Sequence, residues 1–276
     1  MFKLGFSSIG CPDYDIEQIV DLATQNGFEG VELRFVRGTT DLGSLEEFAP
    51  GNLARTRQLF DDAGIEVIAI DTSVRMNSLD EKVRTENREL AKLNLEIAQG
   101  LGASYLRVFG GALPDGQTEA DTRRAITDGL SEVAELTAAG GVISLLETHD
   151  SYSTSDTILE LYSMGASDAL GILWDSLHTY RHGEDATYTW EKLGSRIKHV
   201  HVKDSNSASA DTFDFALTGE GNVPIPHILD TLRTADFSGF VDFEWEKGWH
   251  REIAEPEIAI PHFARYMAEL KLAGQS

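Results

Sequence analysis

Acidic and imidazole side chains recur near the ends of four apolar segments in the second half of the chain. The groups that could do chemistry there are Glu147 and His149, Asp175 and His178, His201 and Lys203, and Glu244 and Glu246. Residues that lie two apart in an extended segment point to the same side. Because burying unpaired charges costs several kcal/mol, this repetition indicates a chemical purpose.

A divalent cation is the simplest cause that would gather such groups, because it offsets their mutual repulsion. The ligands that we expect are Glu147, Asp175, His201 and Glu244. Three carboxylates and one imidazole favour a fairly hard ion, so one Mn²⁺ is expected, with Mg²⁺, Co²⁺ and Zn²⁺ as alternatives. Three anions around a dication leave a slight negative charge, which favours a neutral polyol or ketose over a phosphate-rich ligand.

Eight short apolar segments alternate with amphipathic segments along the chain. The expected strands are KLGFSS (3–8), GVELRF (30–35), IEVIAI (65–70), ASYLRVF (103–109), VISLLE (142–147), LGILWD (170–175), IKHVHV (197–202) and FVDFEW (240–245). The expected helices run from Asp15 to Gly27, from a capping box of Ser44 and Glu47 to Gly64, and over about 80–100, 118–139, 154–164, 185–194, 224–235 and 256–272. The polar stretch SNSASADT (205–212) is expected to form a loop on the active-site face.

Strands that alternate with helices imply parallel pairing with right-handed crossovers. Eight such units at this length predict one α/β domain over residues 1–276, a (β/α)8 TIM barrel. A doubly wound open sheet is the rival architecture, but no GxGxxG follows the first apolar segment. In a barrel, the carboxyl ends of the strands line the active site, which is where the acids and imidazoles lie.

The motifs of the chain resemble those of the xylose isomerase-like barrels, a family of sugar phosphate isomerases and epimerases. These motifs are GFEGVELR (27–34), YLRVFGG (105–111), ETH (147–149), WDSLH (174–178), HVHVKD (199–204), LTGEGNVP (217–224) and FEWEKGWH (243–250). The resemblance covers essentially the whole chain and implies one metal bound by the four expected ligands. It also implies that Glu147 and Glu244 shuttle a proton, as in ketose 3-epimerases, and that His178 contacts substrate oxygens.

The chain departs from the ketose epimerases at one position. Ser207 stands where they carry a substrate-binding arginine, six residues after the metal histidine. Lys203 and Asp204 in this region are instead similar to residues of the dehydratase and uncharacterised branches. The ETH motif places His149 near the metal glutamate, which resembles the branch that cleaves 3-keto-glycosides by β-elimination. The resemblance therefore implies the fold and the metal and leaves the substrate open.

One intermediate connects the reactions that such a site could catalyse. A metal chelated by a carbonyl and a neighbouring hydroxyl acidifies the adjacent C–H and stabilises an enediolate, and a nearby carboxylate removes the proton. Return of the proton gives a sugar isomerase or epimerase of carbohydrate metabolism, which is the expected function. Loss of a β-substituent gives a lyase acting on a keto-polyol or a 3-keto-glycoside, with His149 as the acid or base. A non-catalytic barrel subunit is a further alternative.

Two inward-facing cations have more than one interpretation. Lys203 either contacts the substrate or pairs with Asp204 or Asp175. Arg107 either reaches the substrate or pairs with Glu32 on a strand of the same barrel. Both cations are therefore candidate substrate-binding residues.

The last strand and its loop add two further candidates for substrate binding. Glu246 either supports a metal ligand or a sugar hydroxyl, or is a solvated acid at the rim. Trp249 either forms an apolar platform for a sugar or packs within its loop. His199 and Asp242 are expected one layer below the metal, where they would form a structural hydrogen bond.

The charge of the chain bears on its partners. Its 46 acidic and 23 basic residues give a net charge of −23, which would repel nucleic acids and anionic membranes. The same charge and the few metal histidines argue against a DNA-repair endonuclease on this fold. No apolar run approaches the roughly 18–20 residues that span a bilayer, and MFKLGFSSIG shows no secretory pattern.

The single cysteine, Cys11, is compatible with a reducing compartment. We therefore expect a cytoplasmic enzyme whose partner is a small sugar or keto-polyol. Whether it forms a homo-oligomer or works with a partner subunit is left open.

Overall fold

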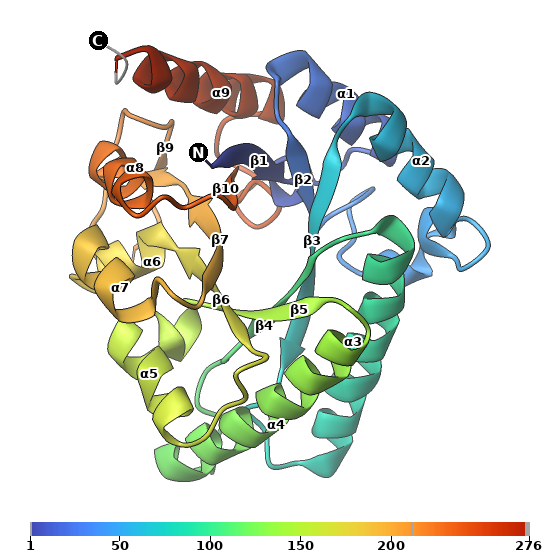
Figure 1. Ribbon diagram of the computed structural model, residues 1–276, viewed down its shortest axis with the longest axis vertical. Helices are drawn as coiled ribbons and strands as arrows, with labels where there is room; N and C mark the ends of the chain where they lie inside the picture. Colours follow the sequence, from blue (N-terminus) through green and yellow to red (C-terminus); the bar gives the residue numbers. More distant parts are fainter. Residues whose placement is uncertain (1, 211, 274–276) are drawn as a thin grey trace.

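A closed barrel of parallel strands forms the centre of the protein, and helices surround it (Figure 1). The computed structural model describes residues 2–210 and 212–273. Within these residues, eight strands close the barrel in the order β1, β10, β7, β6, β5, β4, β3 and β2. Each neighbouring pair is parallel, so the predicted (β/α)8 architecture is confirmed.

The barrel strands lie where the apolar segments predict them. They are β1 (Lys3–Ser7), β2 (Gly30–Leu33), β3 (Glu66–Arg75), β4 (Tyr105–Phe109), β5 (Ile143–Glu147), β6 (Gly171–Asp175), β7 (Ile197–Val202) and β10 (Phe240–Phe243). β3 continues beyond the expected end at residue 70, and its register with β4 shifts between Asp71 and Arg75. The Thr72 hydroxyl donates to the carbonyl of Arg107 at 2.7 Å and holds this extension against β4.

Helices cover the outside of the barrel and connect its strands. They are α1 (Ile16–Asn26), α2 (Leu53–Ala63), α3 (Glu81–Leu101), α4 (Glu119–Ala139), α5 (Ser155–Ser163), α6 (Ser176–Arg181), α7 (Ala186–Leu193), α8 (Ile225–Thr234) and α9 (Pro256–Ala273). The predicted boundaries of α1 are confirmed. Asp15 and Gln18 form a reciprocal capping box at its start, and Gly27 ends it with a left-handed φ of 69°.

The predicted capping box before α2 is wrong. The Ser44 hydroxyl donates to the backbone oxygen of Asp41, and two short 3-10 turns occupy Leu42–Ser44 and Glu46–Phe48. α2 begins only at Leu53. The sequence between them contains Pro50, and a proline disfavours helical backbone at the preceding residue, so a helix from Ser44 cannot continue into α2.

Three elements at the active-site face were not predicted: α6, β8 and β9. α6 follows β6 without a loop, because Asp175 Oδ1 accepts the backbone N–H groups of Leu177 and His178 at 2.9 and 3.1 Å. After β7, β8 (Asp204–Ser205) pairs with β9 (Phe215–Ala216) in a small antiparallel sheet. The loop expected over 205–212 therefore begins within β8, and its residue 211 lies outside the described residues.

The register of neighbouring strands brings the chemical groups to one end of the barrel. Asp175 on β6 is the register partner of His201 on β7, and His201 is the register partner of Asp242 on β10. Glu147 is the last residue of the neighbouring β5. Because the strands are parallel, their carboxyl ends meet, and Glu244 lies one inward step beyond Asp242.

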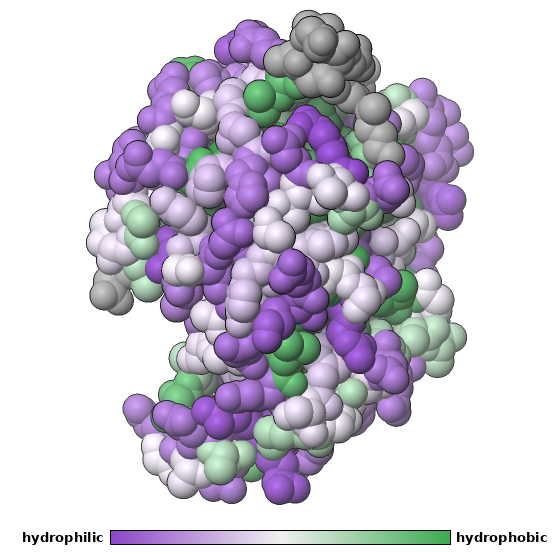
Figure 2. Space-filling model, turned by 60° about the vertical axis from the view of Figure 1, so that its left-hand side comes forward, coloured by the Kyte–Doolittle hydropathy of each residue, from purple (hydrophilic) through white to green (hydrophobic). Residues whose placement is uncertain are grey.

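The face of the molecule that Figure 2 shows is mainly polar. In the view that brings α5, α7 and α8 forward, hydrophilic residues predominate and hydrophobic ones form small separate patches (Figure 2). None of the described helices is long and apolar enough to cross a membrane.

Candidate metal and substrate site

Four side chains from four neighbouring strands converge at the carboxyl end of the barrel. One donor atom from each lies within 4.8 Å of the donor atoms of the others, and all four side chains are buried; the residues are Glu147, Asp175, His201 and Glu244. They are the four residues that the sequence nominates as metal ligands. β5, β6 and β7 supply the first three, and the fourth directly follows β10.

His201 has one ring nitrogen fixed and the other free. Its Nε2 donates to Glu32 Oε2 at 2.9 Å. Its Nδ1 points at the acids, 3.6 Å from Glu147 Oε1 and 3.4 Å from Glu244 Oε2. Burial lowers the pKa of His201, but the carboxylates of Glu32 and Glu244 outweigh burial and raise this pKa well above its usual value. Glu32 therefore directs Nδ1 toward the cluster.

Glu147 is held by a buried arginine. Arg107 Nη1 donates to Glu147 Oε2 at 2.7 Å, and Arg107 Nη2 lies 3.2 Å from Asp71 Oδ2. Burial raises the pKa of Glu147, but Arg107 outweighs burial and lowers this pKa to about 2. Glu147 is thus an anion at neutral pH. Of the two roles expected for Arg107, pairing with Glu32 is wrong, because its partners are Asp71 and Glu147.

Lys203 places its ammonium group among three carboxylates. Its Nζ lies 2.7 Å from Asp175 Oδ2 and 2.8 Å from Glu246 Oε1, and it donates to Glu244 Oε2. Burial lowers the pKa of Lys203, but Asp175 and Glu244 outweigh burial and raise it well above its usual value. The alternative pairing with Asp204 does not form, since Asp204 accepts backbone N–H groups of its own loop. The alternative pairing with Asp175 is confirmed, whereas the contacts of Lys203 with Glu244 and Glu246 were not predicted.

The donor set fits a divalent cation. Three buried atoms of the cluster, Glu147 Oε1, Asp175 Oδ2 and His201 Nδ1, have no hydrogen-bond partner among the described residues. Of these, Asp175 Oδ2 is in an ion pair with Lys203. Burial raises the pKa of Asp175 to about 6, although Lys203 opposes this, so repulsion among the acids is only partly relieved. Carboxylate oxygens and an imidazole nitrogen are ligands that manganese and zinc accept. The cluster therefore offers unmet donors to a cation.

Two histidines lie beside the cluster. The rings of His149 and His178 meet edge to face with centroids 4.4 Å apart. Burial lowers the pKa of His149, but Asp150, 3.0 Å from its Nδ1, outweighs burial and raises it. The pKa of His178 is well below its usual value because of burial and the neighbouring His149. One imidazole is therefore biased toward its charged form and the other toward its neutral form.

A layer of buried polar groups lies beneath the cluster. His199 Nε2 lies 3.4 Å from Asp242 Oδ2, close to the pairing that the sequence predicts. The same nitrogen donates to Glu32 Oε2 at 3.1 Å. Glu32 thus accepts from both His199 and His201, a bridging role that sequence reasoning missed.

A cavity of about 370 Å³ opens above the cluster at the mouth of the barrel. Its walls include the predicted residues Arg107, His149, Glu244, Glu246 and Trp249. Trp249 is 56% exposed and packs edge to face on Phe35 with ring centroids 4.9 Å apart. The guanidinium carbon of Arg34 lies over the same indole, 5.8 Å from the ring centroid. The walls also contain residues that sequence reasoning missed: Arg34, Arg75, Phe109 and Phe213. The only signal for Arg34 was its place near the end of the expected strand 30–35, and Arg75 lies beyond the expected strand 65–70, in the part of β3 that was not predicted.

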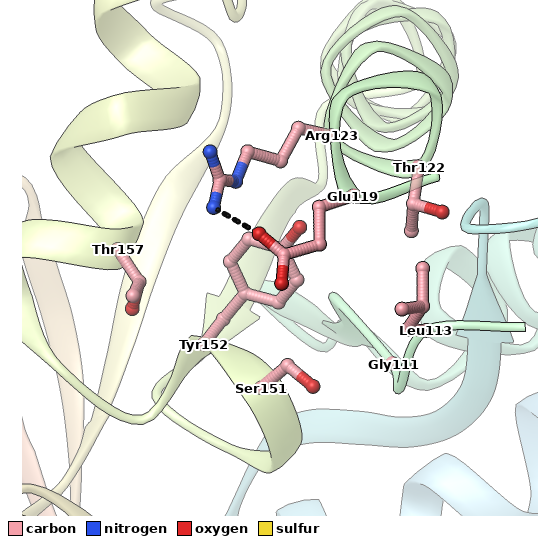
Figure 3. Close-up of a pocket in the computed structure, with 8 residues that line it drawn as sticks. All are labelled: Gly111, Leu113, Glu119, Thr122, Arg123, Ser151, Tyr152 and Thr157. Carbon is pink, nitrogen blue, oxygen red and sulfur yellow. Dashed lines mark hydrogen bonds and ion pairs between the residues drawn. The ribbon is translucent and has the colours of Figure 1, made fainter. Parts of the chain in front are cut away.

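A second cavity of about 180 Å³ lies between the start of α4 and the loop after β5 (Figure 3). Its charged groups are paired with each other, since Arg123 Nη2 donates to Glu119 Oε2 at 3.1 Å. Arg123 Nε also lies 3.3 Å from Glu160 Oε2. The two charged residues that line this cavity, Glu119 and Arg123, are therefore paired with each other.

The chain matches the family profile described as xylose isomerase-like TIM barrel over residues 20–269. It belongs to the xylose isomerase-like TIM barrel family. The resemblance inferred from the motifs is therefore confirmed. In barrels of this kind the active site lies at the carboxyl ends of the strands, which is where the four-residue cluster and the cavity are found.

Members of the family that are similar to this chain include sugar epimerases and dehydratases. The fructoselysine 3-epimerase of Escherichia coli O157:H7 is 22% identical over 256 residues, covering 88% of this chain and 90% of that protein. The 3-dehydroshikimate dehydratase of Bacillus anthracis is 25% identical over 260 residues, covering 88% of this chain and 89% of that protein. The solved structure of an IolI protein with a bound zinc atom has a TM-score of 0.81 at 19% identity and covers 98% of each chain. These relatives support an enzyme of this superfamily.

Proposed function

We propose that this chain is a divalent-metal-dependent isomerase or epimerase that acts on a sugar and transfers a proton next to a carbonyl group. One observation carries the proposal. Four donor atoms from Glu147, Asp175, His201 and Glu244 lie within 4.8 Å of one another in a buried cluster. The epimerases among its relatives support the same reading.

The metal would supply the electrophile. Bound by the four side chains, a divalent cation would polarise the substrate carbonyl and make the adjacent C–H acidic. We propose Mn²⁺, because three of the four ligands are carboxylates, and Zn²⁺ is supported by the zinc-bound relative.

The chain's own carboxylates would move the proton. Glu147 is anionic at neutral pH because Arg107 lowers its pKa to about 2. Glu244 joins the cluster to the cavity, since it belongs to both. We propose that these two glutamates remove and return the proton through an enediolate and that His178 contacts substrate oxygens, while Lys203 stays paired with its three carboxylates.

A lyase is the second candidate, and one observation favours it. His149 lines the cavity beside Glu147, and Asp150 raises the pKa of this imidazole despite burial. A protonated imidazole at the cavity wall can donate a proton to a departing hydroxyl or glycosyl oxygen. The dehydratase from Bacillus anthracis among the relatives supports this alternative.

Solvent exchange separates the two candidates. The Mn²⁺-loaded protein is incubated in D2O with free ketoses, keto-inositols and 3-keto-glycosides, and the products are read by NMR and mass spectrometry. Deuterium next to the carbonyl with the carbon skeleton intact is the result expected for an isomerase or epimerase. Loss of water or of an aglycone would assign a lyase. Stoichiometric metal without exchange or elimination in any substrate would oppose both reactions.

The setting of the reaction is part of the proposal. The net charge of −23 supports a small-molecule substrate rather than nucleic acid or an anionic membrane surface. We propose one catalytic domain that works in the cytoplasm.

A further inference from the structure

Three arginines line this cavity, and we name them the arginine wall: Arg34, Arg75 and Arg107. Arg34 directly follows β2, Arg75 ends the neighbouring β3, and Arg107 lies in the middle of β4. Arg107 is neutralised by Asp71 and Glu147. The charges of Arg34 and Arg75 need a separate explanation.

Arg34 is a buried cation without an anionic partner. It is only 5% exposed, yet none of the described carboxylates lies within 4.0 Å of its guanidinium nitrogens. Nη1 donates to the backbone oxygen of Asp71 at 3.1 Å and Nη2 to Ser73 Oγ at 2.9 Å. Its Nε has no acceptor among the described residues. In a chain with 46 acidic residues, a buried arginine left in this state is unusual.

The acids of the same cavity have partners inside the protein. Glu246 Oε1 lies 2.8 Å from Lys203 Nζ, and Glu244 also accepts from Lys203. Asp150 lies 3.0 Å from the His149 ring. Each of these acids therefore has a basic or imidazole partner inside the protein, while Arg34 and the exposed Arg75 have no carboxylate within 4.0 Å among the described residues.

Electrostatics supports the same conclusion. Burial and the neighbouring Arg107 lower the pKa of Arg34 to about 10, although Asp71 and Glu147 oppose this. Two like charges side by side at a cavity wall become more stable when an anion lies against them. In the second cavity, by contrast, Arg123 already has carboxylate partners in Glu119 and Glu160.

We propose that the substrate of this site is a sugar acid or polyhydroxy keto acid whose carboxylate binds Arg34 and Arg75. The inference rests on the proposed function, since it places the carbonyl of the same molecule toward the four-residue cluster. Contacts of the carboxylate with the arginine wall and of the carbonyl with the acidic cluster would fix the orientation of the bound substrate.

The dimensions and lining of the cavity favour a compact carboxylate over a phosphate ester. A space of about 370 Å³ lies at the lower end of the range for small-molecule sites. Phosphate sites commonly use backbone N–H groups of glycine-rich loops or helix starts, and no glycine is among the described residues that line this cavity. Trp249 and Phe213, 56% and 46% exposed, provide apolar faces for the carbon skeleton.

Binding of matched ligands tests the inference. Isothermal titration calorimetry of the Mn²⁺-loaded protein compares D-glucuronate with D-glucose and quinate with myo-inositol, and glucose 6-phosphate serves as the phosphate probe. The carboxylates should bind about 10- to 100-fold more tightly than their neutral partners, as a charge-assisted hydrogen bond to a buried arginine provides. Tighter binding of glucose 6-phosphate than of glucuronate would overturn the assignment to a carboxylate.

Three variants and a matched control locate the effect. Arg34→Gln and Arg75→Gln should each reduce the preference for the carboxylates by about tenfold without changing the affinity for glucose. Arg34→Lys should keep part of the preference. Arg123→Gln, in the second cavity, should leave it unchanged. Because Arg34 also donates to Asp71 and Ser73, Arg75→Gln decides the matter if the Arg34 variants do not fold.

The outcomes separate this inference from the proposed function. Equal affinity for acids and neutral sugars, or a preference that survives both glutamine variants, overturns the arginine subsite even if solvent exchange is observed. Conversely, a preference that depends on Arg34 and Arg75 supports the subsite even if no substrate exchanges its proton, because calorimetry does not require turnover.

Discussion

The two walls of the barrel mouth carry opposite charges and differ in whether these charges are paired within the protein. On the acidic wall, formed by Glu147, Asp175, Glu244 and Glu246, each carboxylate is paired inside the protein with Arg107 or Lys203. On the arginine wall, Arg34 has no carboxylate within 4.0 Å among the described residues. The acidic wall can still bind a cation, because its four carboxylates share only two basic partners, whereas the unpaired Arg34 is suited to select an anionic ligand. We therefore expect the acidic wall to determine the reaction and the arginine wall to determine which substrate binds.

The substitution with the largest expected effect lies in the acidic wall. Glu147→Gln keeps the shape of the side chain but removes both a proposed cation ligand and the proposed base. Turnover should fall by about a thousandfold, and the bound Mn²⁺ measured by mass spectrometry should fall with it. Glu66→Gln, an exposed residue at the opposite end of β3, is the control and should retain both.

A Glu147→Gln protein that keeps its metal and more than a tenth of its turnover would remove Glu147 from the chemistry. In that case His149, which lines the same cavity, would be the base to test next.

The two walls were not equally predictable from the sequence. The acids of β5, β6, β7 and β10 fall at strand ends, and parallel strands bring their ends together, so the grouping of Glu147, Asp175, His201 and Glu244 followed from the strand pattern. Arg34 and Arg75 also lie at strand ends, but an arginine there ordinarily finds one of many acids. Only the three-dimensional contacts reveal that Arg34 lacks such a partner.

The sequence also could not predict which partners the side chains of the acidic wall contact. Alternation along β7 places Lys203 on the inward face, but it does not say which acids the ammonium group reaches. Glu32 was nominated as a partner of Arg107, yet it accepts from His199 and His201 across the barrel. Such pairings depend on how far each strand is shifted along its neighbour, and the register irregularities of β2 and β6 cannot be inferred from propensities.

The next effect removes the internal cation of the acidic wall. Lys203→Met leaves Asp175, Glu244 and Glu246 buried without their shared partner, so the metal-free protein should lose about 3 kcal/mol of unfolding free energy. Mn²⁺ should restore more stability to this variant than to the wild type, because it then has no ammonium group as competitor. Urea unfolding with EDTA and with Mn²⁺ measures both quantities.

Lys198→Met, on the same strand but half-buried, is the matched control and should change neither quantity. Equal stability of the Lys203→Met protein and the wild type in EDTA would indicate that the acids are balanced by something other than Lys203.

A smaller effect concerns the orientation of His201. Glu32→Gln keeps an acceptor for the Nε2–H of His201 but removes the negative charge behind the ring. The affinity for Mn²⁺, measured by competition with a chelating dye, should fall by about tenfold, at the lower end for outer partners of metal ligands. Glu29→Gln, at the exposed residue just before β2, should leave it unchanged. Unchanged affinity in Glu32→Gln would mean that the register of β7 alone orients the ring.

The mildest test changes only the pH. The pKa of Asp175 is raised to about 6 by burial, and that of His201 lies well above its usual value because Glu32 and Glu244 outweigh burial. A cation requires the carboxylate of Asp175 and an unprotonated Nδ1 of His201, so it must displace their protons. Affinity for Mn²⁺ should therefore rise by about tenfold per pH unit between pH 6 and 8, and more steeply below pH 6, where two protons leave.

Calorimetry in buffers with different ionisation enthalpies counts these protons directly. About one proton should be released per Mn²⁺ at pH 7, and fewer in Glu32→Gln, because the loss of that carboxylate lowers the pKa of His201. The binding of D-glucuronate to the arginine wall should release no proton over the same range, since arginine stays charged. If no proton is released on binding of Mn²⁺ at pH 7, His201 is already neutral. Glu32 and Glu244 then do not raise the pKa of His201 as their distances imply.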